Sequence, residues 1–164
     1  MIEMTDPTLF SLYIGIGMIL SLFLSETLGV TAGGIIVPGY IALNLDDPYR
    51  IITTFVISSI VYLIIQFLSN FILIYGKRRI VLALILGFLF GSITRTGGEN
   101  ILFNIDLVVV GNIIPGLIAN WMDKQGVIRT ISTVLITACV THLFIMTLFA
   151  YLFHRLILKS LDIL

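Results

Sequence analysis

The sequence predicts an all-α polytopic membrane protein built from two internal repeats. Its 164 residues are 59% hydrophobic and 11% charged, with a mean hydropathy of +1.14, whereas soluble domains carry about a quarter charged residues. A nine-residue pattern, GIIVPGYIA at 34–42, returns as GNIIPGLIA at 111–119 with six identical positions. Each copy places a Pro-Gly pair inside apolar sequence, where proline removes a backbone donor and glycine permits unusual angles. Paired interruptions of this kind are typical of repeat-built membrane folds.

The first repeat, residues 7–75, is predicted to contain a helix, a Pro-Gly segment and a second helix. Residues 7–25 are long enough to span a hydrocarbon core of ~30 Å. Asp6 and Pro7 suit the N-cap and the first position of that helix. We expect a turn at 26–29, the first Pro-Gly segment at 30–45 and a full transmembrane helix at 51–75.

The second repeat, residues 80–158, has the same order, and a cationic cluster at 76–79 separates it from the first. Its first helix is expected at 80–94, where Gly87 and Gly91 have the spacing of a small-residue packing face. A polar loop at 95–106, the second Pro-Gly segment at 107–122 and a final helix at 127–158 are expected to follow. No polar stretch is long enough for a soluble domain, so residues 1–164 are predicted to form a single membrane domain.

Two topologies fit these segments. The loop of Lys77, Arg78 and Arg79 is expected in the cytoplasm by the positive-inside rule. If the Pro-Gly segments enter the membrane and return, the chain has four full spans and its halves are parallel. If the Pro-Gly segments cross, the chain has six spans in two inverted halves.

Charge does not choose between the two topologies. Re-entrant segments would leave Arg155 and Lys159 inside with the cationic loop, whereas crossing segments would leave Lys124 and Arg129 there instead, so each model counts five cations inside. The length of the Pro-Gly segments, about 16 residues, and their tight flanking turns favour crossing. Both models place Glu26 on the same side of the membrane as Lys124.

The Pro-Gly pairs allow two interpretations. Because the residue before proline avoids helical angles, Val37 and Ile114 are expected to be extended, with a half-helix beginning after each break. Two half-helix N-termini, each with about +0.5 charge, would form a carboxylate-binding pair. The alternative is that the breaks only let helices pack closely. Irregular backbone at membrane depth requires burial in protein or a wet cavity in either case.

Other polar residues are weaker candidates. Glu26 fits either a proton or cation site or a water-facing position at the membrane edge, while Arg95 and Lys124 fit interfacial anchors better than anion ligands. His142, which lies in the last helix, fits a bond to a Ser/Thr hydroxyl or a carbonyl group better than a proton relay. The full set of candidate substrate or polymer contacts is Glu26, Pro38, Gly39, Tyr40, Arg95, Asn112, Pro115, Gly116, Asn120 and Lys124.

Several chemistries find no support in the sequence. There is no phosphate-binding loop, no metal-ligand cluster and no nucleophile elbow, so we assign no catalytic residue, metal or cofactor to the chain. The net charge of zero gives no case for nucleic acid, and Cys139 is the single cysteine and therefore has no internal disulfide partner. Energy for an uphill reaction must come from an ion gradient or from a partner protein.

Five ordered motifs resemble the CapC/PgsC family, the small membrane subunits of bacterial poly-γ-glutamate (capsule) synthesis. The motifs are SET-x-G at 25–29, G-x-IVPGY at 34–40, YGKRR at 75–79, G-x-IIPGLIAN at 111–120 and KQG at 124–126. The resemblance runs from about Leu20 to the last helix. It places the chain in the cytoplasmic (inner) membrane of a bacterium.

The resemblance also implies partners and a division of labour. A CapB/PgsB-like ATP-dependent amide ligase would bind ATP and Mg²⁺ and activate glutamate, and a CapA/PgsA-like subunit would take part in export or anchoring. This chain would associate with the ligase and contact both lipid and the polymer. A homo-oligomer of this chain is compatible with these roles. The competing hypotheses are a small anion transporter or channel that acts alone, and a purely structural membrane anchor.

Overall fold

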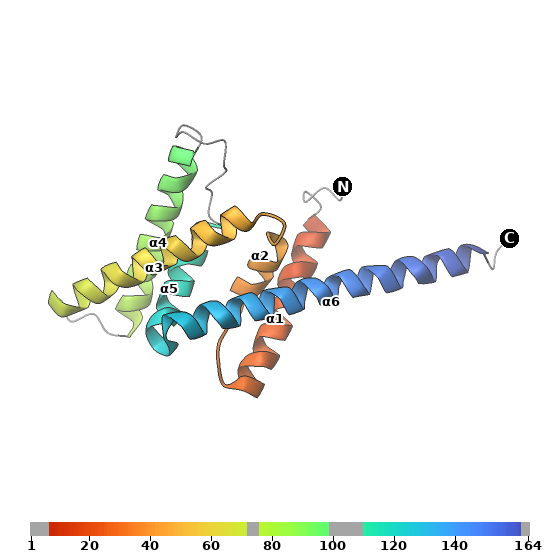
Figure 1. The fold of residues 1–164 in the computed structure, drawn as a ribbon, viewed down its shortest axis with the longest axis horizontal. Coiled ribbons are helices and arrows are strands. Elements are labelled where there is room, and N and C mark those ends of the chain that lie inside the picture. Colours follow the sequence, from red (N-terminus) through yellow and green to blue (C-terminus); the bar gives the residue numbers. More distant parts are fainter. Residues whose placement is uncertain (1–6, 72–75, 99–109, 162–164) are drawn as a thin grey trace.

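The computed structural model describes residues 7–71, 76–98 and 110–161, which form six helices (Figure 1). Each half contains a long helix, a shorter helix and a second long helix. The middle helix of the second half is longer than that of the first half. The helices are α1 (Pro7–Leu28), α2 (Val37–Leu43), α3 (Pro48–Phe71), α4 (Lys77–Gly98), α5 (Ile114–Gln125) and α6 (Val127–Leu161). The fold of the described residues is therefore all-α, as the sequence predicts.

Each short helix packs against helices from both halves of the chain. α2 contacts α1 of its own half and α6 of the other half, while α5 contacts α4 of its own half and α3 of the other. The main apolar core lies where these helices meet and is formed by side chains that are almost fully buried. Its members include Val37, Ile41, Ile114, Ile118, Met122 and Val134. The two halves are consequently interlocked through their Pro-Gly helices.

Glycines make the closest approach between each short helix and the first helix of its half. A Cβ atom built on Gly17 of α1 would lie 2.5 Å from Gly39 Cα, and one built on Gly87 of α4 would lie 2.5 Å from the Gly116 backbone nitrogen. Real Cβ atoms do not approach backbone so closely, so both crossings require glycine. The predicted packing role of Gly87 is confirmed.

The Pro-Gly pairs begin helices, and the expectation of extended residues before the prolines was wrong. Val37 and Ile114 are the first residues of α2 and α5, with Pro38 and Pro115 in the first turn. Proline is tolerated there because the N–H groups of a first turn have no intrahelical acceptor. The chain changes direction earlier, at glycines with positive φ: Gly33 (67°), Gly34 (121°) and Gly111 (69°).

Other element boundaries also differ from expectation. α1 continues into the turn expected at 26–29 and ends at Leu28, and α4 continues into the expected polar loop and ends at Gly98. The rest of that loop lies mostly outside the described residues. α2, at seven residues, is about 10 Å long at 1.5 Å per residue, so this helix alone is too short to cross a ~30 Å core.

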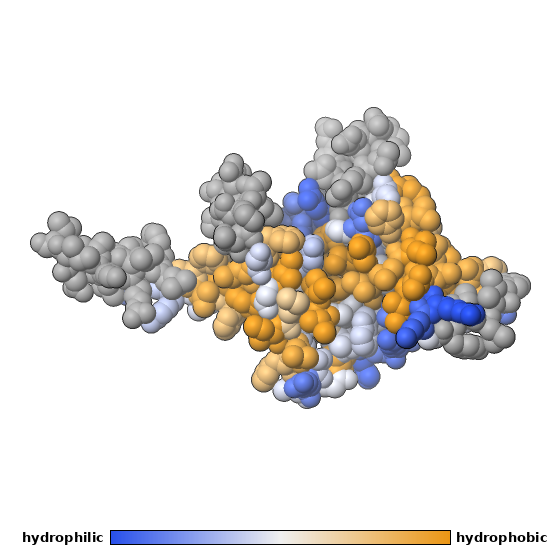
Figure 2. Space-filling view, turned by 180° about the vertical axis from the view of Figure 1, so that it is seen from behind, coloured by the Kyte–Doolittle hydropathy of each residue, from blue (hydrophilic) through white to orange (hydrophobic). Residues whose placement is uncertain are grey.

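The surface of the described residues is that of a membrane protein. Three helices contain stretches long and apolar enough to span a membrane: Phe10–Thr27, Pro48–Asn70 and Val127–Tyr151. Figure 2 shows large apolar side chains over much of the visible face, with polar residues in smaller patches. Exposed apolar side chains of all three helices, such as Ile19 (70%), Leu63 (63%) and Leu143 (65%), contribute to this surface. Such an extensive apolar exterior is stable in lipid and not in water.

Candidate functional site

The first Pro-Gly pair is packed among neighbouring backbone atoms. Pro38 and Gly39 are buried, and a Cβ atom on Gly39 would lie 2.9 Å from Ile14 Cα and from the Tyr13 carbonyl oxygen. Tyr40 is partly buried and packs edge-on against Phe10, with ring centroids 5.5 Å apart. Gly39 therefore makes a close contact with the backbone of α1.

The second Pro-Gly pair has the same kind of environment. Pro115 and Gly116 are buried, and a Cβ atom on Gly116 would overlap the carbonyl oxygen of Ala83 in α4. The residues that precede the first turns of α2 and α5 are apolar: Ile36 is 43% exposed and Ile113 is 53% exposed. The close packing of both breaks is therefore a property of the structure, and contact between the breaks and a polymer stays a prediction.

Side chains of the opposite half hold both Pro-Gly segments in place. His142 of α6 lies with Nδ1 3.2 Å from the Ala42 carbonyl oxygen near the end of α2, and a carbonyl can only accept, so Nδ1–H donates. Thr54 of α3 accepts a 2.9 Å hydrogen bond from the Val110 backbone N–H, just before the second segment. His142 thus has the structural carbonyl bond that the sequence predicts for it.

Gln125 joins the end of α5 to the segment that precedes α2. Its Oε1 accepts a 3.2 Å hydrogen bond from the Thr31 backbone N–H, and its Nε2 donates to the Thr31 carbonyl oxygen. The same Nε2 lies 3.2 Å from Thr130 Oγ1 in α6. One amide side chain therefore satisfies both backbone groups of Thr31, which lies in a stretch without helix or strand bonds.

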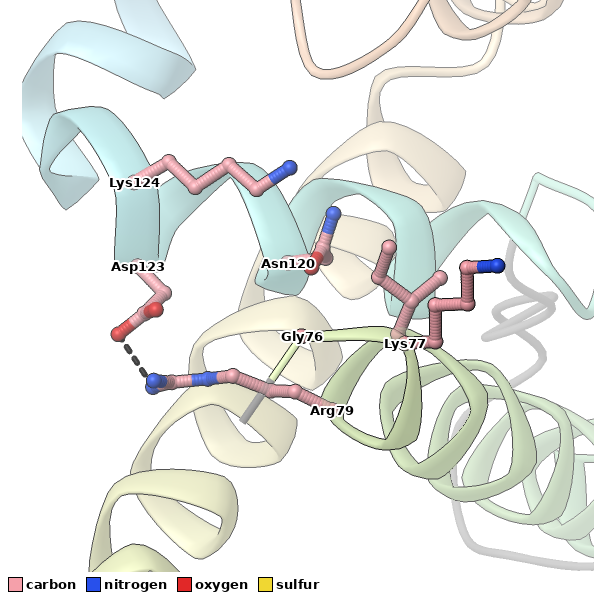
Figure 3. Close-up of a pocket in the computed structure, with 7 residues that line it drawn as sticks. Gly76, Lys77, Arg79, Asn120, Asp123 and Lys124 are labelled. Carbon is pink, nitrogen blue, oxygen red and sulfur yellow. Dashed lines mark hydrogen bonds and ion pairs between the residues drawn. The ribbon is translucent and has the colours of Figure 1, made fainter. Parts of the chain in front are cut away.

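An open cavity lies where the start of α4 meets the second half of α5 (Figure 3). Its volume is about 420 Å³, within the ~300–1,000 Å³ range of small-molecule sites. The residues that line it are mostly polar or charged: Gly76, Lys77, Arg79, Ile80, Asn120, Asp123 and Lys124. The structure thus brings two predicted contact residues, Asn120 and Lys124, together with the cationic loop.

The charges around this cavity are only partly neutralised. Arg79 pairs with Asp123 across the α4–α5 contact. The ammonium groups of Lys77 and Lys124 have no carboxylate partner in the described part of the chain, and Lys124 Nζ lies 4.5 Å from the centre of the Trp121 ring. With one pair compensated, the cavity walls carry an excess of two positive charges.

Asn120 is the buried polar member of the cavity. Its residue is 7% exposed, yet its side-chain amide makes no hydrogen bond to any described residue. Figure 3 shows the amide in the cavity wall between Lys77 and Lys124. Its amide atoms are not among the enclosed side-chain atoms that lack a hydrogen bond, so they open onto the cavity and are available to water or to a ligand there.

The remaining candidates lie away from this cavity. Glu26 is exposed in the last turn of α1, and Arg95 lies in α4 with a side chain outside the described atoms. Asn112 precedes α5, and its Oδ1 is buried without a hydrogen bond among the described residues. The structure therefore does not join these three residues into one site with Asn120.

Sequence reasoning did not select Lys77, Arg79 and Asp123 as site residues. The cationic loop was interpreted only as a topology signal. Its residues lie in the first turn of α4, where Lys77 and Arg79 also line the cavity together with α5. A signal was present in α5, where Asn120 and Lys124 are four residues apart and so share one face. Lys77 and Asn120 come together only through the packing of α4 on α5.

Comparison with known proteins identifies the family. The model of the capsule biosynthesis CapC family matches residues 16–131. The PGA biosynthesis protein CapC of Bacillus subtilis (strain 168) and the capsule biosynthesis protein CapC of Bacillus anthracis are each 34% identical over 134 residues, which covers 79% of this chain and 90% of each relative. No solved structure matches the chain. The resemblance drawn from the five motifs is confirmed, and the chain belongs to the CapC family of capsule biosynthesis proteins.

Proposed function

We propose that this protein is the membrane subunit of a poly-γ-glutamate synthase and works with an ATP-dependent amide ligase. The observation that carries the proposal is family membership, since two relatives that align over most of the chain are named for capsule or PGA biosynthesis. In this proposal a CapB/PgsB-like ligase supplies the ATP and Mg²⁺ chemistry, and a CapA/PgsA-like subunit takes part in export. This chain holds the ligase at the membrane and receives the growing polymer.

The charge of the cavity supports contact with such a product. Poly-γ-glutamate carries one carboxylate per residue, and a carboxylate cannot enter lipid without a compensating partner. Lys77, Arg79 and Lys124 gather beside the buried amide of Asn120. This cluster is a place where the described chain offers positive charge and hydrogen-bond donors to an anionic chain at the membrane surface.

The cavity also supports the topology with six crossings. Lys77 and Lys124 line one cavity, and Arg79 pairs with Asp123. A chain with re-entrant Pro-Gly segments would place the starts of α4 and α6 on opposite sides of the membrane, whereas crossing segments place them on the same side. We therefore propose that these residues face the cytoplasm of a bacterial cell, across its inner membrane.

The arrangement of the two halves supports inverted repeats. α1 and α4 run in opposite directions in Figure 1, as do α3 and α6, which is expected if repeat 1 (7–75) and repeat 2 (80–158) each cross three times. Because α2 alone is about 10 Å long, its crossing would need the eight non-helical residues at 29–36. At about 3.3 Å per extended residue, these residues could supply the missing length.

Cysteine accessibility tests this topology. In a background with Cys139→Ser, single cysteines replacing Glu26, Arg78 and Arg129 should react with a membrane-impermeant thiol reagent only after the cytoplasmic face is opened, whereas one replacing Asp46 should react in intact cells. All four positions are exposed in the structure, so burial does not limit labelling. Opposite sides for Arg78 and Arg129 would refute the crossing model.

Reconstitution tests the function. The chain and its ligase partner should co-purify from a bacterial membrane, and the pair should polymerise glutamate faster than the ligase alone when ATP and Mg²⁺ are supplied. A chain that acts as an anion channel would instead pass anions in liposomes without the ligase. Anion flux combined with no stimulation of polymerisation would overturn the synthase proposal, and co-purification with no stimulation would leave a membrane anchor.

A further inference from the structure

The cavity at the start of α4 has the features of a site that is completed by a ligand. Asn120 is 7% exposed and lines the cavity, but no described residue bonds to its amide. The polar atoms of this amide are not enclosed by protein, so they face the open cavity. The unused donors and acceptor are therefore available to a group that enters the cavity.

The neighbouring charges indicate what this group is. Lys77 and Lys124 present ammonium groups without a carboxylate partner among the described residues. The Arg79–Asp123 pair joins the two helices that form the walls, so it fixes the distance between the cations and is less available to a ligand. The first turn of α4 also leaves its backbone N–H groups without intrahelical acceptors. The cavity thus combines fixed positive charge with one neutral amide.

We propose that this cavity binds a segment of the γ-glutamyl chain, with carboxylates at Lys77 and Lys124 and a backbone amide of the polymer at Asn120. The identity of the occupant rests on the proposed function, whereas the presence of an anion site rests on the cavity alone. The amide of Asn120 both donates and accepts, whichever way it is turned. Two consecutive γ-glutamyl residues offer two carboxylates and an amide group between them, so together they can satisfy all three side chains.

A phosphate group matches the cavity less well. A phosphodiester group carries acceptor oxygens and no donor, so the phosphate by itself would leave the carbonyl oxygen of Asn120 unbonded. Free glutamate carries two carboxylates, but it also carries an ammonium group that the lysines repel, and it has no amide group to bond to Asn120. The chemistry of the walls therefore favours an internal segment of an amide-linked polyanion over either alternative.

Direct binding tests the proposal without the ligase. The full chain in nanodiscs of uncharged phosphatidylcholine is titrated with a fluorescently labelled penta-γ-glutamate, and free glutamate and inorganic phosphate are added as competitors. Saturable binding is expected, and it should weaken steeply as salt rises. Lys77→Gln and Lys124→Gln should each weaken binding by about tenfold, since each removes a charge-assisted hydrogen bond. Asn120→Leu should weaken it by about fivefold.

Matched variants separate the cavity from general charge. Arg78→Gln removes an exposed cation that is adjacent to Lys77 but does not line the cavity, and Arg129→Gln does the same near Lys124. Both should bind penta-γ-glutamate within about twofold of the unsubstituted chain, because exposed charges outside a site contribute little. If Asn120→Leu fails to fold, the two exposed lysines still test the site.

Three results would overturn the proposal. Equal loss in Arg78→Gln and Lys77→Gln would show nonspecific attraction, and full competition by inorganic phosphate would show a phosphate site. Full competition by the water-soluble headgroup glycerophosphoglycerol, in the same uncharged nanodiscs, would show a lipid headgroup site instead. The proposed function can be judged separately. Polymerisation that is stimulated equally by the unsubstituted chain and by Lys77→Gln/Lys124→Gln would reject this cavity while the synthase role stands.

Discussion

The two Pro-Gly helices have the same packing but different ends. α2 and α5 both press a glycine against the first helix of their own half and both contact the last helix of the other half. α2 stops after seven residues, where Asn44 Nδ2 donates to the Tyr40 carbonyl oxygen. α5 continues for twelve residues and carries Asn120, Asp123 and Lys124 into the cavity.

This difference follows the limits of the repeated sequence. Residues 34–42 and 111–119 correspond, and the next pair in that register is Leu43 and Asn120. The residues inside the repeat include Gly39 and Gly116 of the close helix contacts, and they contribute part of the main core, such as Ile41 and Ile118. The polar wall of the cavity begins at the first position beyond it. Residues common to the two copies therefore make the helix contacts of both α2 and α5. The residues that follow the second copy give α5 its polar and charged side chains.

The largest expected effects come from the crossing glycines. Gly116→Ala should destabilise the chain by roughly 3 kcal/mol or more, because overpacking typically costs ~1–3 kcal/mol and here the obstacle is the Ala83 backbone. Gly39→Ala should cost nearly as much, since its Cβ atom would meet Ile14 and Tyr13 at 2.9 Å. Denaturant unfolding in detergent micelles measures both.

Gly15→Ala is the matched control for the crossings. It lies in α1, and a Cβ atom there would meet nothing within 4 Å, so this substitution should be neutral or slightly stabilising through helix propensity. If Gly116→Ala were as stable as Gly15→Ala, the crossing would not be close in solution. If only one of Gly39→Ala and Gly116→Ala were destabilising, the equivalence of the two segments would fail.

A smaller effect is expected at the hydrogen bond that holds the second segment. Thr54→Val should cost about 1–3 kcal/mol, because the buried N–H of Val110 would lose its acceptor while the side-chain volume stays the same. Thr54→Ser should restore most of the stability. Faster hydrogen exchange at the Val110 amide in Thr54→Val, measured by mass spectrometry, locates the change.

The neighbouring Thr53 provides the control for this bond. Its hydroxyl donates only to the Tyr49 carbonyl oxygen of its own helix, in an exposed position, so Thr53→Val should change stability by less than about 0.5 kcal/mol. Unchanged exchange at Val110 in Thr54→Val would contradict the role of α3 in holding the second segment. The first segment, which is held by His142 instead, should be unaffected by either substitution.

The sequence predicted local features of this fold better than contacts between distant segments. Hydropathy and Pro-Gly spacing located the long helices and the two Pro-Gly segments, because these signals are carried by neighbouring residues. The rule for residues before proline misplaced the breaks, since Val37 and Ile114 occupy first helical positions where proline is tolerated. Turning is done instead by Gly33, Gly34 and Gly111, whose positive φ angles favour glycine.

The candidate site was predicted only in part, because some of its residues come together through contacts between distant segments. Asn120 and Lys124 were recognised because they lie close to the second Pro-Gly pair, but Lys77 is 43 residues before Asn120 and meets it only when α4 packs on α5. Likewise, Gln125 reaches Thr31 across 94 positions of sequence. A single sequence carries no signal for such pairs, because each side chain alone is also compatible with an exposed position.

The smallest expected effect on stability is at the ion pair between Arg79 and Asp123, which has no counterpart between α1 and α2 among the described residues. The two side chains are 21% and 25% exposed, and ion pairs that solvent reaches are worth about 0–1 kcal/mol. Asp123→Asn should therefore lower stability by less than about 1 kcal/mol in denaturant unfolding.

The same substitution leaves Arg79 without its partner and adds positive charge to the cavity, so penta-γ-glutamate should bind more tightly, by about twofold to fivefold. Asp47→Asn removes a comparable pair with Arg50 outside the cavity and should leave that affinity unchanged. Weaker binding in Asp123→Asn would mean that the pair's main contribution is to hold α4 against α5, and that the ligand depends on the shape of this contact more than on its charge.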